Sequence, residues 1–169
     1  MENLEFKYNY NIPTLSTIDT KKYSDQAHLS ERKRSPYIIH KKGDNFNQVF
    51  NFILEDSYMT PHLHPGPKMI EKMHLISGSF KLLFFDDSGK VREIYNLDKP
   101  SQKVQVPGYT WHTYIMTSKL TIIFETMMGV YDPKNWKKMP DWAPKENTKE
   151  AIEYLKALNI DINPETLFI

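Results

Sequence analysis

The chain has 169 residues, a length within the usual range for one domain with an ordinary buried core. It carries 22 basic against 21 acidic side chains, and this near balance gives no general attraction to the phosphates of nucleic acid. The sequence contains no cysteine, which excludes disulfides, thiolate metal ligands and a cysteine nucleophile.

The amino-terminal part of the chain is polar. Residues 1–10 contain charged side chains and no long apolar run, so they predict neither a signal peptide nor a membrane span. A cytoplasmic location is therefore the default expectation. A helix is expected around residues 18–29, followed by a basic run at residues 32–34. We interpret residues 1–42 as a leader packed on the core.

The body of the chain is predicted to be β structure. After Gly43, short apolar segments are broken by Gly, Pro, Asp and Ser at intervals of roughly ten residues, which is typical of an antiparallel sandwich or barrel. Eight short strands suit a jelly roll. Residues 77–78 and 86–89 are predicted to be hairpin turns. The expected strands are 48–54, 58–64, 71–77, 80–85, 91–97, 102–106, 111–116 and 120–128.

The carboxy-terminal part, residues 131–169, is rich in Pro, Trp and Lys and is expected to form an extended strap followed by a helix. Apolar side chains spaced three and four apart predict an amphipathic helix over residues 146–158. The fold class is therefore all-β, with the barrel over residues 43–130. Leader, barrel and strap are predicted to form one domain.

Two histidines and a glutamate lie close together in the middle of the chain, at His62, His64 and Glu71. In a strand, side chains two positions apart point to the same face, so His62 and His64 can reach one metal ion. The Pro-Gly-Pro turn that follows allows the chain to double back, which lets Glu71 supply an anionic oxygen. His112 comes just after a Pro-Gly turn, and we predict that it completes the set.

A single histidine in a β protein is more often a packed or surface residue than a ligand, and His28 and His40 are interpreted in that way. The combination of a His-x-His pair, a carboxylate and a later histidine rarely occurs by chance, so we predict one divalent transition-metal ion. Nitrogen and oxygen ligands suit Fe, Mn, Co, Ni or Zn. Coordination positions left open to water or substrate favour catalysis over a purely structural role.

Other side chains near the candidate site are assigned by position. His74 comes three positions after Glu71, so a regular strand turns it to the opposite face, and it is left out of the set unless a bulge shifts the register. Tyr114 is a candidate acid or base, with core packing as the alternative. Arg32 and Arg34 are candidates for binding a phosphate group, with a solvated basic turn as the alternative.

The spacing of the first three ligand candidates resembles the cupin superfamily. The first motif of that family is Gly, five residues, His-x-His, three or four residues, Glu, six residues and Gly. Here six residues separate His64 from Glu71, and six separate Glu71 from Gly78. The second spacing fits the motif and the first is longer.

The second cupin motif, Gly, five residues, Pro-x-Gly-x-x-His, is matched at Pro107 and His112. Tyr109 stands where the glycine of this motif would be, and Gly108 is expected to take over the turn. The resemblance implies a cupin-type jelly-roll barrel of about eight strands that holds its metal ion inside.

A narrower likeness is to the WbuC-like cupin metalloproteins found with bacterial surface-polysaccharide genes. It covers roughly residues 27–144 and implies a metal-bearing cupin linked to O-antigen or similar glycan assembly. It does not imply a particular reaction. The matching pieces are Ser30-x-Arg32-x-Arg34, Ser57-Tyr58-x-x-Pro61-His62-x-His64-Pro65, Phe84-Phe85-Asp86-Asp87-x-Gly89, Thr110-Trp111-His112-Thr113, Tyr131-Asp132-Pro133 and Trp142-Ala143-Pro144.

Three functions fit such a site. The first is a metal-dependent isomerase or epimerase acting on a nucleotide-linked sugar, whose carbonyl group a metal ion polarises as a Lewis acid. The second is a non-haem iron or manganese oxygenase, because the same ligand set can bind dioxygen beside an organic substrate. The third is a binding or sensory module that holds a sugar or a metal without turnover.

The expected partners are a small sugar-type molecule and a second copy of the chain, without nucleic acid or membrane. The aromatic residues Tyr131, Trp136 and Trp142 and an expected edge strand at residues 48–54 predict a homodimer. Small cupins similar to this one often form dimers. The alternative is that these aromatic residues pack within one chain.

Overall fold

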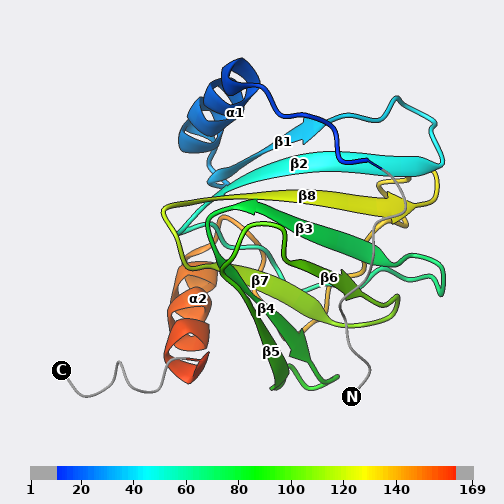
Figure 1. Cartoon of the computed structure of the whole chain (residues 1–169). Helices are drawn as coiled ribbons and strands as arrows, with labels where there is room; N and C mark the ends of the chain where they lie inside the picture. Colours follow the sequence, from blue (N-terminus) through cyan, green and yellow to red (C-terminus); the bar gives the residue numbers. More distant parts are fainter. Residues whose placement is uncertain (1–10, 163–169) are drawn as a thin grey trace.

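The computed structural model describes residues 11–162, which form two antiparallel β-sheets with a helix before and a helix after the strands (Figure 1). The larger sheet has the strand order β1-β2-β8-β3-β6 and the smaller sheet the order β5-β4-β7. The predicted jelly-roll barrel is thereby confirmed. The elements are α1 (Thr17–Leu29), β1 (Arg34–Ile38), β2 (Phe46–Leu54), β3 (Glu71–Ser77), β4 (Phe80–Phe85), β5 (Val91–Leu97), β6 (Lys103–Val106), β7 (His112–Met116), β8 (Leu120–Met128) and α2 (Lys149–Ile162).

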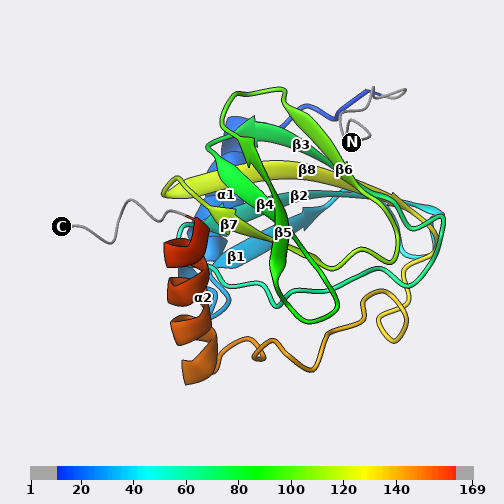
Figure 2. The same ribbon diagram turned by 90° about the horizontal axis from the view of Figure 1, so that it is seen from below.

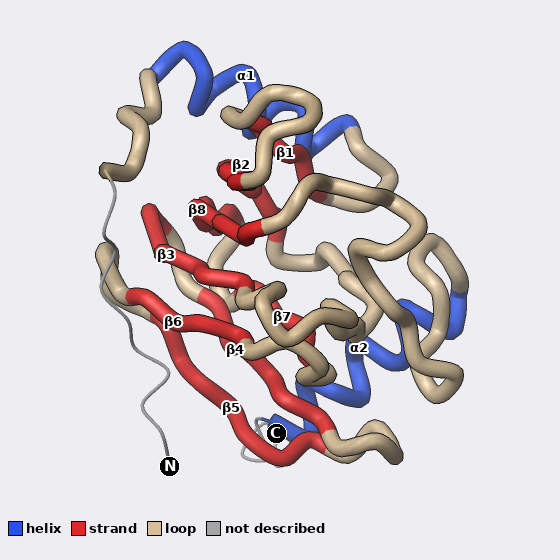
Figure 3. The backbone as a smooth tube through the Cα atoms, turned by 90° about the vertical axis from the view of Figure 1, so that its right-hand side faces the viewer, coloured by secondary structure: helices blue, strands red, loops and turns tan. Residues whose placement is uncertain are grey.

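Successive side chains alternate between the barrel interior and the outer face of each sheet. Ile53 of β2 and Ile123 of β8 point inward and belong to the same core as Leu82 of β4. Phe52 points outward and packs with Ala27 of α1. Figure 3 shows α1 beside the β1 end of the larger sheet, with the strands of the smaller sheet at the other end of the molecule. Burying each large apolar side chain contributes roughly 1.5–3 kcal/mol, so the interior core holds the two sheets together.

The prediction of a strand at residues 58–64 is wrong. In this part of the chain, His62 forms one isolated bridge with His112, and Leu63 forms another with Lys138. Prolines on both sides of the His-Leu-His segment lack the N–H group that a longer ladder needs. The segment is therefore held at single points between β7 and the strap.

Strand β1 comes from the region expected to be a leader. It pairs antiparallel with β2, with Arg34 opposite Ile53. Because β2 lies between β1 and β8, the expectation that residues 48–54 form an edge strand is wrong. Strand β1 is not predicted from the sequence because it begins at the last residue of the basic run and contains Pro36. Proline is nevertheless tolerated in an edge strand such as this one.

The turn at residues 77–78 connects the two sheets. Strand β3 pairs with β6 and β8, whereas β4 pairs with β5 and β7, so the predicted hairpin at this turn is wrong. Gly78 has φ +83°, and a Cβ there would lie 2.5 Å from the carbonyl oxygen of Leu120. Only glycine fits this crossing. The hairpin predicted at residues 86–89 is confirmed, since β4 and β5 pair directly.

The strap, residues 131–148, runs along one side of the barrel from β8 to α2 (Figure 2). The predicted helix is present but begins at Lys149 instead of residue 146. The reason is that Glu146 is bound to Arg34 in an ion pair and Thr148 accepts a hydrogen bond from the first turn of the helix. The division at residues 42 and 130 into leader, barrel and strap stays a prediction.

The last expectation concerns membrane-spanning segments. The prediction that residues 1–10 form neither a signal peptide nor a membrane span lies outside the described residues. Between residues 11 and 162, no helix has the length and apolar character needed to cross a membrane.

Candidate metal centre

Four polar side chains converge in the barrel interior. His62 and His64 come from the segment before β3, Glu71 is the first residue of β3, and His112 is the first residue of β7. All four are buried. One potential ligand atom from each residue lies within 4.8 Å of those of the other three. The structure therefore brings together the four residues that the sequence predicts as ligands.

Backbone pairing sets the relative position of two of the histidines. The N–H group of His62 donates to the carbonyl oxygen of His112 at 3.0 Å, and the N–H group of His112 donates back to His62 at 2.9 Å. The centroids of the two imidazole rings are 4.5 Å apart. A segment outside the sheets is thus fixed against β7 at the point where both residues contribute a ring.

A hydrogen bond from Nδ1 to a backbone carbonyl orients each of the three imidazole rings. Because a carbonyl oxygen only accepts, Nδ1 carries the proton in each ring, and the neutral ring has its lone pair on Nε2. Metal-binding histidines are commonly held in this way, with the unprotonated nitrogen turned to the ion. The bonds run from His62 to Thr60 at 3.0 Å, from His64 to Trp136 at 2.7 Å and from His112 to Thr110 at 2.8 Å.

The spacing of the converging atoms fits a common metal ion. Among the described residues, Nε2 of His62 and Nε2 of His64 are buried and make no hydrogen bond. Oε2 of Glu71 lies 2.9 Å from Nε2 of His112 and 3.4 Å from Nε2 of His64. Two ligand atoms at right angles around one ion lie about 3 Å apart when each bond to the ion is about 2.1 Å. The four residues therefore fit a divalent metal, which would also satisfy the two buried nitrogens.

The protonation states suit the same role. Burial, together with the positive charge of Lys137, lowers the pKa of His62 well below its usual range, so this ring is neutral at neutral pH. Burial alone would raise the pKa of Glu71, but its close contacts with His112 and His64, at 2.9 Å and 3.4 Å, outweigh burial and hold that pKa well below its usual range. A neutral imidazole and an ionised carboxylate are the forms that bind metal ions.

Tyr109 occupies the position at which the cupin motif has glycine. Its φ is 60°, in the left-handed region, which costs an L-residue roughly 1–2 kcal/mol. Its N–H group donates to the carbonyl oxygen of His64 at 2.9 Å, and this bond ties the turn before β7 to the ligand segment. The left-handed residue of this turn is therefore Tyr109 itself, and the expectation that Gly108 takes over the turn is wrong in this respect.

Tyr114 and Glu125 point into the interior near the four converging residues. Tyr114 is buried on the same face of β7 as His112. Burial and the charge of Glu125 raise the pKa of Tyr114 well above its usual range. Glu125 of β8 lies opposite Met73, and its buried Oε1 has no hydrogen-bond partner among the described residues. Burial and the charge of Glu71 raise the pKa of Glu125 well above its usual range.

Glu125 is a residue that sequence reasoning missed. An acidic side chain at an inward position of the apolar strand 120–128 was the available signal. The strand pattern alone does not show that this position lies beside the four converging residues. Lys137 of the strap was also missed, since nothing in the local sequence tells which side of the strap faces the barrel.

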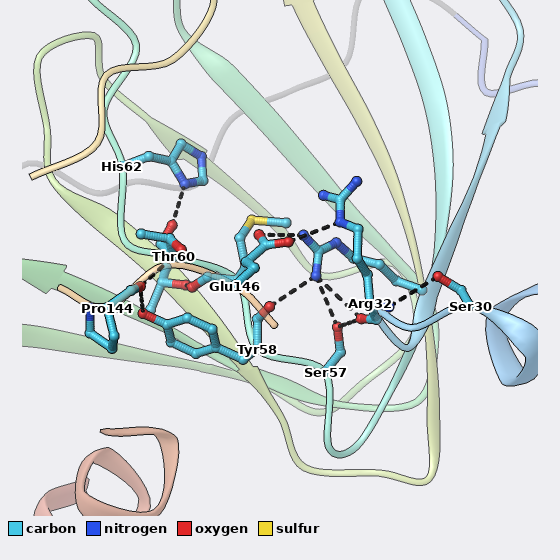
Figure 4. A network of polar contacts seen from close by, with 11 residues as sticks. Ser30, Arg32, Ser57, Tyr58, Thr60, His62, Pro144 and Glu146 are labelled. Atoms are coloured by element: carbon cyan, nitrogen blue, oxygen red, sulfur yellow. Dashed lines mark hydrogen bonds and ion pairs between the residues drawn. The ribbon is translucent and has the colours of Figure 1, made fainter. Parts of the chain in front are cut away.

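Arg32 and Arg34 are both paired with Glu146 of the strap, at 2.9 Å and 2.6 Å. Arg34 is buried and also donates to the carbonyl oxygen of Tyr58 and to the hydroxyl of Ser57. Figure 4 shows Arg32, Glu146, Ser57 and Tyr58 in one polar network. These contacts fasten the strap to the barrel, and the role of the two arginines in binding phosphate stays a prediction.

The same network reaches the metal centre. The hydroxyl groups of Tyr58 and Thr60 both donate to the carbonyl oxygen of Pro144, at 2.8 Å and 3.2 Å. The carbonyl oxygen of Thr60 in turn accepts the hydrogen bond from His62 (Figure 4). The strap therefore supports one ligand through Thr60 and a second through Trp136.

His74 lies away from the converging residues. In β3, the side chains of Glu71 and Met73 both point into the barrel, so the side chain of His74, next to Met73, points outward. The irregularity in the pairing of β3 with β8 falls between Leu75 and Ser77, beyond His74. No bulge therefore turns His74 toward Glu71.

Fold and site together define a cupin-type jelly-roll barrel with an internal His₃Glu cluster suited to a divalent metal ion. A family model described as a domain of unknown function (DUF6016) matches residues 15–97. No curated protein matches the chain.

Two solved structures of similar fold are oxalate decarboxylases. That of Bacillus subtilis, which contains Mn(II) centres, is similar over 63% of this chain, with 15% identity and a TM-score of 0.50. That of Lactobacillus farciminis, solved as a formate complex, is similar over 80% of this chain, with 15% identity and a TM-score of 0.51. The matching part spans only 28% and 36% of those longer chains. At this identity the likeness shows the fold alone.

Proposed function

We propose that the protein is a metal-dependent cupin enzyme whose single ion is bound by His62, His64, Glu71 and His112. The observation that carries this proposal is the orientation of the three imidazole rings. Each ring donates from Nδ1 to a backbone carbonyl and turns Nε2 toward Glu71, as a metal ligand set requires. Fe, Mn, Co, Ni and Zn all remain compatible with this donor set.

The first experiment is elemental mass spectrometry of the purified protein beside a His62→Ala/His64→Ala double variant. The proposal expects close to one metal ion per chain in the wild type and a loss of that metal in the variant. Wild-type protein that contains no metal and takes up no added divalent ion contradicts the proposal. Circular dichroism of both proteins separates loss of the ligands from loss of the fold.

As the reaction, we propose isomerisation or epimerisation of a nucleotide-linked sugar in the assembly of a bacterial surface polysaccharide. This finer proposal rests on the resemblance to WbuC-like cupins and on the placement of Tyr114 and Glu125 beside the centre. The bound ion would polarise a carbonyl or hydroxyl oxygen of the substrate as a Lewis acid. Tyr114 and Glu125 are the groups that can hold or move a proton there.

Two alternatives use the same site. An iron- or manganese-dependent oxygenase requires oxygen uptake that depends on the loaded metal, which an oxygen electrode detects. A binding module requires saturable sugar binding without turnover. Incubating the metal-loaded protein with nucleotide-linked sugars in D₂O and recording NMR spectra tests the preferred reaction, because isomerisation or epimerisation moves a carbon-bound proton.

The homodimer is a further prediction. Of the aromatic residues on which it rested, Trp142 packs on Phe85 and Trp136 on Tyr131 within the chain. The outer side of the strap still exposes Tyr131, at 56%. Light scattering at micromolar concentration measures the mass, and a monomeric value contradicts the prediction.

A further inference from the structure

Lys137 is held beside the metal centre by the backbone on both sides of it. The carbonyl oxygen of Trp136 accepts the hydrogen bond from His64. The backbone of Lys138 exchanges two hydrogen bonds with that of Leu63, at 3.0 Å and 2.9 Å. The residue between these anchors is therefore fixed against the ligand segment, although it lies 73 positions beyond His64 in the chain.

Lys137 also lines a cavity of about 490 Å³ between the strap and the inward faces of β1 and β2. Met59 and Trp136 form part of its wall, and the ring of Trp136 lies 6.2 Å from that of His64. The exposed side chains of Ile38 and Tyr131 are among the residues that line the cavity. It has the size of a small-molecule site. None of the four converging residues lines it, and the Trp136 ring in its wall lies between it and His64.

The other cationic side chain at this cavity is already engaged. Arg32 lines the cavity but pairs with Glu146, as Arg34 does behind it. Within residues 11–162, the ammonium group of Lys137 makes no hydrogen bond and no ion pair at bonding distance. Burial lowers the pKa of this group, and the more distant charges of Glu71 and Glu125 act against that lowering.

The charge of the site favours an anionic ligand. The charge of Lys137 reaches the ligands, since it acts on the ring of His62. With a divalent ion on Glu71 and the three neutral histidines, the centre and Lys137 together are positive whether or not Glu125 carries a proton. Two cationic centres close together in a partly desolvated region repel each other, and an anion placed between them removes that repulsion.

We propose that Lys137 is a substrate-binding residue and that the substrate carries an anionic oxygen group, a carboxylate or a phosphate, which Lys137 binds next to the oxygens that a bound metal ion would take. This inference rests on the proposed metal-dependent function and deepens it. Lys137 selects acidic sugars, or sugars linked to phosphate, over neutral ones. Three flexible donors on a compact charge suit either group.

The test measures binding of three sugars of similar size to the metal-loaded protein by isothermal titration calorimetry. Glucuronate carries a carboxylate, glucose 1-phosphate carries a phosphate, and glucose is neutral. The proteins are the wild type, Lys137→Gln, Lys137→Arg and the control Lys138→Gln, whose side chain is exposed next to Lys137. Metal content and unfolding temperature are recorded for each protein, so that a damaged fold is recognised.

The wild type is expected to bind at least one anionic sugar at least about tenfold more tightly than glucose, the size of effect expected from one charge-assisted hydrogen bond. Lys137→Gln loses that preference, Lys137→Arg retains part of it, and Lys138→Gln keeps all of it. Which anionic sugar binds identifies the carboxylate or the phosphate.

Three results overturn the inference: no preference for either anionic sugar, an unchanged preference in folded Lys137→Gln, or the same loss in Lys138→Gln. These results leave the metal-dependent function standing when the wild type contains its ion. A wild type that binds no metal overturns both proposals.

Discussion

Gly108 lies directly against the carbonyl oxygen of Gly66, and a Cβ at Gly108 would be 1.9 Å from that oxygen. The contact joins the turn that follows His64 to the turn that precedes His112. No side chain fits between them. The close approach of these two turns therefore determines how near the two histidines come to each other. It also explains why residue 108 is glycine, although its φ is not positive.

We predict that Gly108→Ala separates the two turns and weakens metal binding. Overpacking of this kind costs about 1–3 kcal/mol in the free energy of unfolding. Chemical denaturation and metal titration check the two effects. The control is Gly43→Ala, where nothing lies within 4 Å of the new Cβ and only the strain of φ +92° is added. Equal metal affinity in Gly108→Ala and the wild type would show that the turns are free to separate without consequence.

Glu71→Gln keeps the shape of the side chain but removes the only carboxylate among the four converging residues. We expect metal affinity to fall by about tenfold or more, because an amide is a weaker ligand than a carboxylate for a divalent ion. Competition with a fluorescent chelator measures the change. His74→Gln is the matched control on the outer face of β3. A similar loss in both variants would mean that the effect comes from β3 as a whole.

Glu146 makes stability depend on pH. Burial raises its pKa, but the charge and hydrogen bond of Arg34 outweigh burial, followed by those of Arg32, and the folded-state pKa is lowered. The pKa is thus lower in the folded than in the unfolded state, so this stabilisation is complete above the unfolded value of 4.5. It is lost as the pH falls through the folded value.

We therefore predict that Glu146→Gln destabilises the protein at pH 7 by about 2–4 kcal/mol, because the buried guanidinium of Arg34 loses its partner. Urea denaturation between pH 3 and pH 7 measures the free energy of unfolding at each pH. As the pH falls, this free energy should decrease less in the variant than in the wild type, because the variant lacks the contribution of Glu146. Asp25→Asn, which breaks an exposed ion pair with Lys21, is the control and should change little. Parallel acid limbs in wild type and Glu146→Gln would contradict this assignment.

The sequence predicts those features that depend on local patterns. The His-x-His spacing and a Pro-Gly-Pro turn were enough to group His62, His64 and Glu71, although neither histidine lies in the expected strand and His62 forms only an isolated bridge. What the sequence missed depends on contacts between distant segments. Lys137 lies at the site because the strap is hydrogen-bonded to the ligand segment, and Glu125 because of the register in which β8 pairs with β3. The segment 58–64 forms no strand because its backbone partners are single residues of β7 and of the strap. Such pairings cannot be predicted from one short window.

Tyr114→Phe separates a chemical role from a packing role at the centre. The hydroxyl group is buried and the phenyl ring fills the same volume, so metal content should be unchanged and the unfolding temperature should move by only a few degrees. If Tyr114 moves a proton in sugar isomerisation, turnover and deuterium exchange measured by NMR should fall by about 10²–10⁴-fold. Tyr37→Phe, on the α1 side of the larger sheet, is the control. Wild-type turnover in a folded, metal-loaded Tyr114→Phe variant would leave packing as the role of this side chain and make Glu125 the remaining proton carrier beside the ion.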